Sequence, residues 1–169
     1  MSTKKIVFTG PECSGKTTIC RAVAQELKVE WVEEYARQYL EEINRPYKEE
    51  DLLAIAKGQI AKEQAQIRNN TPFLLCDTSM LVIKIWSLVK YGRCHPWIEQ
   101  QLQNDDSIYF LCKPNIPWVA DPLRENSNDR ERLFLLYEKE LLTMKKTYIV
   151  LQNREAKRKQ EVIDFIRLT

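Results

Sequence analysis

The sequence predicts a single α/β domain over residues 1–169, built on a five-stranded parallel sheet with helices on both faces. Short β-branched and aromatic runs alternate with longer stretches of helical periodicity, which is typical of strands joined by crossover helices. The length is that of one domain, and no linker or internal repeat divides the chain. Apolar residues make up 44% and charged residues 30%, an ordinary globular mixture that excludes disorder.

Five short apolar runs are the expected strands. Each is nearly continuous in apolar residues, as parallel strands buried on both faces require. They lie at residues 5–9, 29–32, 73–76, 107–112 and 147–151.

The stretches between these runs are the expected helices. They lie at residues 16–27, 33–43, 49 to about 69, 79–91, 129–144 and 155–168. In the helix at 16–27, apolar residues recur every four positions. Pro46 stops the helix at 33–43, and Gly92 ends the helix at 79–91. Residues 94–97 are expected to form a surface turn. Residues 113–128 hold three prolines, and we expect a lid at about 114–130.

Composition excludes several classes of protein. The 26 basic and 24 acidic residues give a net charge of +2, so no basic field indicates a nucleic-acid partner. The richest apolar stretch, residues 73–89, contains Asp77 and Lys84 and falls short of a membrane span. Five widely spaced cysteines and one histidine cannot form a zinc site. No secretory signal precedes the first run, so we expect a cytoplasmic protein that acts on a small molecule.

Residues 10–17 read GPECSGKT and match the phosphate-binding loop G-x-x-x-x-G-K-[ST] at each fixed position. The loop follows a strand and opens a helix, so backbone N–H groups can surround phosphate oxygens. The motif therefore predicts the three-layer fold of P-loop NTPases, the alternative being a glycine turn of another α/β fold. The expected ATP-binding residues of the loop are Gly10, Glu12, Cys13, Ser14, Gly15, Lys16, Thr17 and Thr18. Lys16 would reach the β- and γ-phosphates, and Thr17 would bind Mg²⁺.

Asp77 directly follows the third apolar run. A second metal-coordinating acid lies at this point in P-loop NTPases. We therefore expect Asp77 to bind Mg²⁺ together with Thr17 and to be catalytic. The alternative is that Asp77 caps the helix that follows.

The expected lid carries arginines rather than a guanine-reading motif. The chain reads CKPN at 112–115 and has no N-K-x-D there, so a GTPase is not indicated. Lid arginines can neutralise the charge that develops during phosphoryl transfer. We expect Arg124, near Asp121, to be catalytic and Arg130 to bind ATP. The alternative for Arg130 and Arg132 is a pair of solvated charges at the start of a helix.

Residues 33–37 read EEYAR and follow the second run, at the edge of the sheet where open α/β folds bind ligands. An acid here, Glu33 or Glu34, could orient or deprotonate an acceptor hydroxyl. Arg37 could hold a phosphate or pair with that acid. The alternative is a charged helix N-terminus.

Four segments together resemble a known family. GPECSGKTT, EEYAR, LLCDTS and PWVADPLRE occur in this order and are similar to the ribosylnicotinamide kinase domain of bacterial NadR-type proteins. The resemblance covers nearly the whole chain. It implies a kinase that uses ATP and Mg²⁺ to phosphorylate the ribose 5′-hydroxyl of nicotinamide riboside, giving nicotinamide mononucleotide. It also implies the sheet order 2-3-1-4-5.

The resemblance also assigns residues to the two substrates. Lys16 and Thr17 would serve the phosphates and Mg²⁺, and Asp77 would lie near both metal and acceptor. The acceptor and lid motifs supply Glu33, Glu34, Tyr35, Arg37, Trp118, Asp121 and Arg124. Trp118 would stack on the nicotinamide ring, or else pack in the interior. Ser79 stands where the family often has a second acid, so the general base is either Asp77 or Glu34.

NadR-type proteins commonly carry an adenylyltransferase domain ahead of the kinase. This chain begins just before its first strand, so we expect a separate adenylyltransferase to act downstream on its product. Two alternatives remain: a kinase for another nucleoside or nucleoside monophosphate, and an ATP-dependent switch with no acceptor. The basic cluster Arg154, Lys157, Arg158 and Lys159 is expected to be the solvated face of the last helix.

Overall fold

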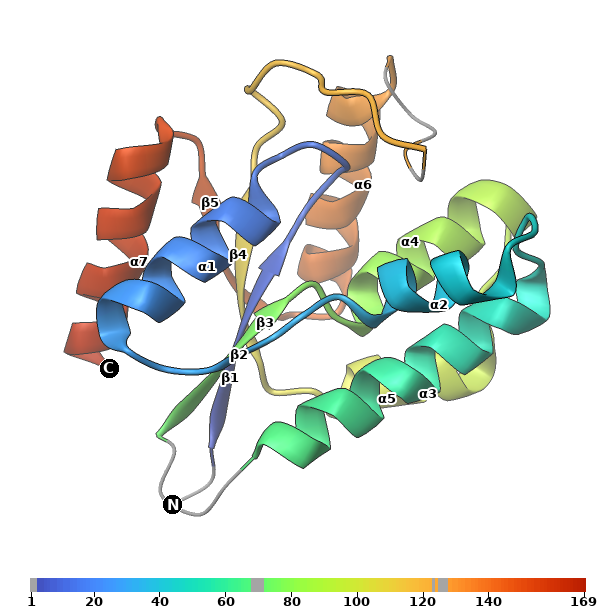
Figure 1. Ribbon diagram of the computed structural model, residues 1–169, viewed down its shortest axis with the longest axis horizontal. Coiled ribbons are helices and arrows are strands. Elements are labelled where there is room, and N and C mark those ends of the chain that lie inside the picture. The colour runs from blue at the N-terminus through green and yellow to red at the C-terminus, as the bar shows by residue number, and fades with distance from the viewer. Residues whose placement is uncertain (1–2, 68–71, 123, 125–127) are drawn as a thin grey trace.

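A computed structural model describes residues 3–67, 72–122, 124 and 128–169 (Figure 1). Its centre is a five-stranded sheet in the order β2-β3-β1-β4-β5, so the predicted order is confirmed. All four strand pairs are parallel. The strands are β1 (Lys4–Thr9), β2 (Trp31–Val32), β3 (Phe73–Asp77), β4 (Ile108–Cys112) and β5 (Thr147–Leu151).

Helices cover both faces of the sheet, which makes three layers. They are α1 (Lys16–Leu27), α2 (Tyr35–Ile43), α3 (Glu49–Gln66), α4 (Met80–Tyr91), α5 (Pro96–Asn104), α6 (Arg130–Thr143) and α7 (Glu155–Leu168). Figure 1 shows α1 and α7 side by side on one face, with α2 to α5 on the other. The α6 helix packs on the same core as α2 to α5.

The central strand β1 divides the interior into two cores because its side chains alternate between the faces. Ile6 and Phe8 join the core beneath α1 and α7. Val7 joins the larger core beneath the other helices. Val7 pairs in register with Cys76 of β3 and Tyr109 of β4, both fully buried, so β1 is covered on both faces and at both edges.

The predicted elements differ from the observed ones in three places. The second strand has two residues rather than four, and the helix α3 ends at Gln66. The predicted end of that helix, near residue 69, lies outside the described residues. The predicted surface turn at 94–97 is wrong, because residues 96–104 form α5. His95 caps this helix by accepting a hydrogen bond from the Trp97 N–H at 3.1 Å, and Pro96 occupies its first position.

The loop after β1 passes close to the end of β4. Gly10 has φ 135°, and a Cβ there would lie 2.7 Å from the carbonyl oxygen of Cys112. Only glycine allows this approach, which sets the loop over the carboxyl edge of the sheet.

All five cysteines are free. In the part of the chain that is described, none of the helices combines the length and the apolarity that a membrane span needs.

A close contact between α2 and α3 gives a stability test. A Cβ on Gly58 would lie 2.0 Å from Cε1 of Tyr35, so the ring would have to move. We expect Gly58→Ala to lower the free energy of unfolding by about 2 kcal/mol, and thermal unfolding should show Tm falling by about 4–8 °C. In a Tyr35→Ala background the same change should raise Tm, because alanine favours the helix. An equal fall in both backgrounds would contradict this account.

Candidate active site

A cavity of about 590 Å³ lies over the carboxyl edge of the sheet, within the size range of small-molecule sites. It extends from the phosphate loop to α2 and α4, and the segment between β4 and α6 covers it. Its wall is formed by Gly10, Glu12, Cys13, Ser14, Gly15, Lys16, Thr17, Thr18, Glu34, Arg37, Leu40, Val82, Trp86, Ile116, Pro117, Val119, Arg124, Tyr137 and Glu155. All eight predicted phosphate-loop residues therefore line one cavity.

The phosphate loop leads directly into α1. Gly15 is the N-cap of this helix, with φ 88°, and it has no side chain to occupy the first N–H groups. These groups and the positive end of the helix dipole are therefore available to an anion. The Lys16 ammonium donates a hydrogen bond to the carbonyl oxygen of Pro11 at 2.7 Å.

Thr17 and Asp77 meet at the base of the loop. The Thr17 hydroxyl donates to Oδ2 of Asp77 at 2.6 Å. The Asp77 side chain is buried, and within the described residues its Oδ1 has no hydrogen-bond partner. Burial raises the pKa of Asp77, and the bond from Thr17 opposes this effect. Asp77 does not cap the following helix, because Ser79 does so by accepting from the Leu81 N–H.

This pair suits Mg²⁺, which prefers hard oxygen ligands and takes few from the protein. A hydroxyl and a buried carboxylate oxygen without a partner are such ligands. Among the residues with described positions, no group of three or more His, Cys, Asp or Glu side chains could hold a metal. An ion at Thr17 and Asp77 would therefore need further ligands from phosphate oxygens.

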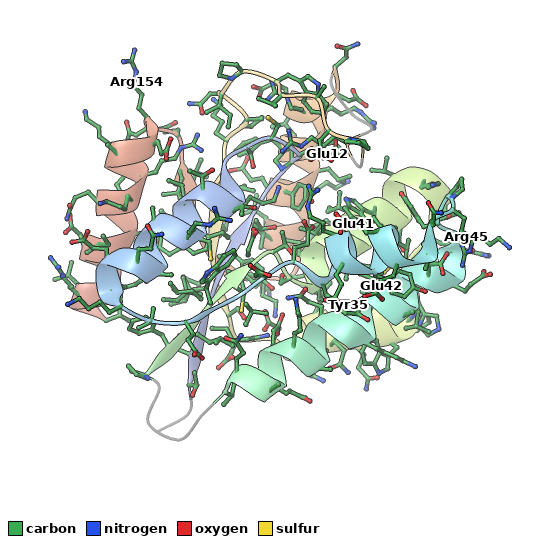
Figure 2. The ribbon with its side chains drawn as sticks, in the orientation of Figure 1. Glu12, Tyr35, Glu41, Glu42, Arg45 and Arg154 are labelled. Atoms are coloured by element: carbon green, nitrogen blue, oxygen red, sulfur yellow. The ribbon has the colours of Figure 1, made fainter. Side chains whose placement is uncertain are left out.

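Residues of the EEYAR motif line two cavities. Glu34 and Arg37 line the main cavity and also a second one of about 340 Å³ beside β2, whereas Glu33 lines only the second. Burial raises the pKa of Glu34, and the nearby Lys16 charge opposes this effect. Tyr35 is not brought to either wall. Its ring packs against α3 at Gly58, and Figure 2 shows it on the side of α2 that faces α3.

The lid segment contacts the phosphate loop and α2. Cys13 Sγ donates to the Pro117 carbonyl at 3.3 Å and accepts from the Val119 N–H at 3.4 Å. Asp121 does not line the cavity but pairs with Arg37 at 3.1 Å, so the acceptor and lid motifs touch. Arg124 lines the cavity. Residues 123 and 125–127 of the predicted lid lie outside the described residues.

The Arg130 guanidinium lies over the Trp118 ring, and the predicted substrate roles of both residues stay predictions. Trp118 is not among the residues that line the cavity. The guanidinium groups of Arg124 and Arg130 lie 5.9 and 5.6 Å from the centre of its ring. Arg130 donates to the carbonyls of Cys13 and Ile116 at 3.1 and 3.0 Å. It therefore joins the phosphate loop to the lid segment, and it is not a fully solvated charge. Arg132 is exposed and pairs with Asp129.

Sequence reasoning missed several residues. Leu40, Val82, Trp86 and Tyr137 form the wall opposite the phosphate loop. They belong to apolar stripes of their helices, and periodicity does not distinguish a cavity wall from a packed core. The prediction that Arg158 is solvated is wrong. Its side chain is 2% exposed and lies behind the phosphate loop.

The sequence matches the model of the AAA domain family AAA_28 over residues 5–159. The chain belongs to this family. No curated protein matches the sequence of this AAA domain.

Solved structures share the fold of the AAA domain. One is the NadR protein in complex with NR, with TM-score 0.83, 19% identity, and 97% of this chain and 50% of that chain covered. Another is the NadR protein in complex with NAD and AMP-PNP, with TM-score 0.72 and 19% identity. The match covers 96% of this chain and 48% of that chain. A third is deoxyadenosine kinase from M. mycoides with the products dCMP and dCDP, with TM-score 0.64 and 12% identity. The match covers 98% of this chain and 100% of that chain.

The share of each neighbour's chain that the match covers differs between the NadR structures and deoxyadenosine kinase. The AAA domain spans about half the length of the NadR chains it matches and the whole of deoxyadenosine kinase. The predicted resemblance to the kinase domain of NadR-type proteins is confirmed for the fold.

The raised pKa of Asp77 has a consequence for stability. Between the ordinary value of 3.8 and the higher native value, the folded state binds more protons than the unfolded state, so stability falls as pH rises. Asp77→Asn removes this charge but keeps an acceptor for Thr17. We expect Tm without nucleotide to rise by about 2–4 °C at about pH 8, and to rise less at about pH 4, as measured by thermal unfolding.

The exposed Asp106 supplies the control, since Asp106→Asn should leave Tm unchanged at both pH values. A lower Tm for Asp77→Asn at about pH 8 would show that the ionised carboxylate stabilises the fold.

Proposed function

We propose that this AAA domain is a kinase that transfers the γ-phosphate of ATP to the ribose 5′-hydroxyl of nicotinamide riboside. One observation carries the proposal: a single cavity joins a phosphate loop to an acid, an arginine and an aromatic wall. The fold shared with NadR in complex with NR supports the same acceptor. The product would be nicotinamide mononucleotide.

The nucleotide occupies the half of the cavity made by the loop and α1. Backbone N–H groups at the start of α1 bind the phosphate oxygens. Lys16 exchanges its bond to the Pro11 carbonyl for one to the β- and γ-phosphates. Thr17 and Asp77 would hold Mg²⁺, which would supply positive charge to neutralise the phosphates.

Glu34 is the general base in this proposal. Asp77 has one oxygen bonded to Thr17 and serves the metal, whereas Glu34 lines the main cavity. Burial raises the pKa of Glu34, which makes its carboxylate a stronger base for taking a proton from a hydroxyl. The 5′-oxygen attacks the γ-phosphorus, the bond to the bridging oxygen of ADP breaks, and the proton passes to the Glu34 carboxylate.

The wall opposite the loop binds the base of the acceptor. The aromatic residues Trp86 and Tyr137 line this wall, and Glu12 and Glu34 place negative charge nearby. The pyridinium ring of nicotinamide riboside is a cation, and such a ring is attracted to an indole face. Neutral nucleosides lack this attraction. Arg124, which reaches the cavity from the lid, neutralises charge on the transferring phosphoryl group.

The second candidate is a kinase for another nucleoside. The observation that favours it is the fold shared with the full length of deoxyadenosine kinase.

Release of ADP from Mg-ATP tests both candidates. We expect nicotinamide riboside to stimulate turnover strongly, and other nucleosides and nucleoside monophosphates to do so weakly. Lys16→Ala should lower kcat by about 100- to 1,000-fold, because it removes a cation that contacts the phosphates in the transition state. Stimulation by a different nucleoside would contradict nicotinamide riboside as the acceptor but would still support a kinase. Tight ATP binding with no stimulation by any acceptor would contradict the kinase proposal and favour a nucleotide-dependent switch.

Two tryptophans separate acceptor binding from lid function. We expect Trp86→Leu to raise KM for nicotinamide riboside about 10-fold, equivalent to about 1.4 kcal/mol, and to leave KM for ATP unchanged. Trp86→Phe should retain most of the affinity. Trp118→Leu should leave the acceptor KM within about twofold of the parent value, because its ring contacts Arg124 and Arg130 instead. Steady-state kinetics with each substrate varied give these values, and the opposite pattern would assign the acceptor ring to Trp118.

A further inference from the structure

The last helix places one arginine in the interior, beneath the phosphate loop. Arg158 is 2% exposed, whereas Arg154 at the start of α7 projects away from the molecule (Figure 2). A Cβ on Gly15 would lie 3.6 Å from Nη1 of Arg158. The guanidinium therefore packs directly against the back of the loop.

Arg158 connects three segments at the carboxyl edge of the sheet. Nη1 donates to the Ser14 carbonyl in the phosphate loop at 2.7 Å. Nη2 donates to the Lys113 carbonyl at 2.8 Å and to Oδ1 of Asn115, both at the start of the lid segment. Nε donates to the Asn153 carbonyl just before α7 at 2.7 Å. A planar guanidinium can serve several loops in this way, and an ammonium cannot.

These four acceptors are neutral oxygens, so they accept from four of the five N–H groups but do not balance the charge. A buried cation is costly unless an opposite charge compensates it. The phosphate loop is the adjacent place where anionic oxygens bind. The Ser14 carbonyl belongs to the same peptide group as the Gly15 N–H, so a cation on that carbonyl polarises the group and strengthens the N–H as a donor.

We propose that Arg158 is a positioning residue for the nucleotide. It fixes the Ser14–Gly15 peptide and the start of the lid in one arrangement, and it adds positive charge behind the phosphate site. It acts through the loop and does not touch ATP. The inference rests on the proposed function only in taking the phosphate loop as the ATP site.

Titration calorimetry with Mg-ATP on the full chain tests this role without an acceptor. We expect Arg158→Gln to weaken Mg-ATP binding about 10-fold, in keeping with the loss of charge-assisted hydrogen bonds. Arg158→Lys keeps the charge and one contact and should lose about threefold. The rise in Tm caused by Mg-ATP should shrink in the same order, and KM for the acceptor should stay unchanged. Lys157→Gln, an exposed neighbour on α7, is the control for loss of one positive charge and should bind as the parent does.

Two results would overturn the proposal: parental Mg-ATP affinity in Arg158→Gln, or an equal rise in the KM of both substrates. If Arg158→Gln does not fold, the exposed Asn115 carries the test. Asn115→Ala removes one acceptor of the guanidinium and should weaken Mg-ATP binding about threefold, and parental affinity in this variant would overturn the proposal too. Normal Mg-ATP binding by the parent chain without phosphorylation of any acceptor would overturn the proposed function instead.

Discussion

A hydrogen bond between α1 and β3 fixes the geometry on which the rest of the site depends. The Thr17 hydroxyl lies 2.6 Å from Asp77 Oδ2, so the helix that leaves the phosphate loop is joined to the end of the neighbouring strand. Thr78 follows with φ 68°, a strained conformation for a β-branched residue, and its N–H donates to the Phe8 carbonyl of β1 at 2.9 Å. The sheet thus holds Asp77 at one distance from the loop, and within the described residues one oxygen of the buried carboxylate has no hydrogen-bond partner.

The lid is held by contacts of a different kind. Among the described residues, its contacts with the phosphate loop include thiol, carbonyl and amide contacts around Cys13, and its contacts with α2 include the partly exposed pair of Arg37 and Asp121. Exposed ion pairs contribute little to stability, so the pair of Arg37 and Asp121 adds little to the hold on this segment. Arg130 and Arg158 instead bond to backbone carbonyls behind the loop. The start of the lid segment is therefore joined to α7 as well as to the phosphate loop.

Elements set by local pattern could be predicted from the sequence. Residues that are close in the sequence determine the buried strands, the phosphate loop and the position of Asp77 after a strand. The sheet order was predicted from the family resemblance. Features set by long-range packing could not be predicted. Helix α5 is short, and its start at Pro96 resembled a turn. Arg158 stands in a basic run typical of a solvated face, and only the fold brings Ser14 and Lys113 to its donors. Trp86 has the spacing of a core residue, and the cavity beside it is formed by the lid.

The shortness of β2 affects how copies of this protein meet one another. A second molecule can extend a sheet only where an edge strand presents a long row of unpaired backbone groups. At this edge the strand is only Trp31 and Val32, and two charged residues, Glu33 and Glu34, follow at once. The flank of the molecule beside the acceptor motif therefore offers almost no template for intermolecular strand pairing. A site can stay open to solvent there without becoming a place where the chain aggregates.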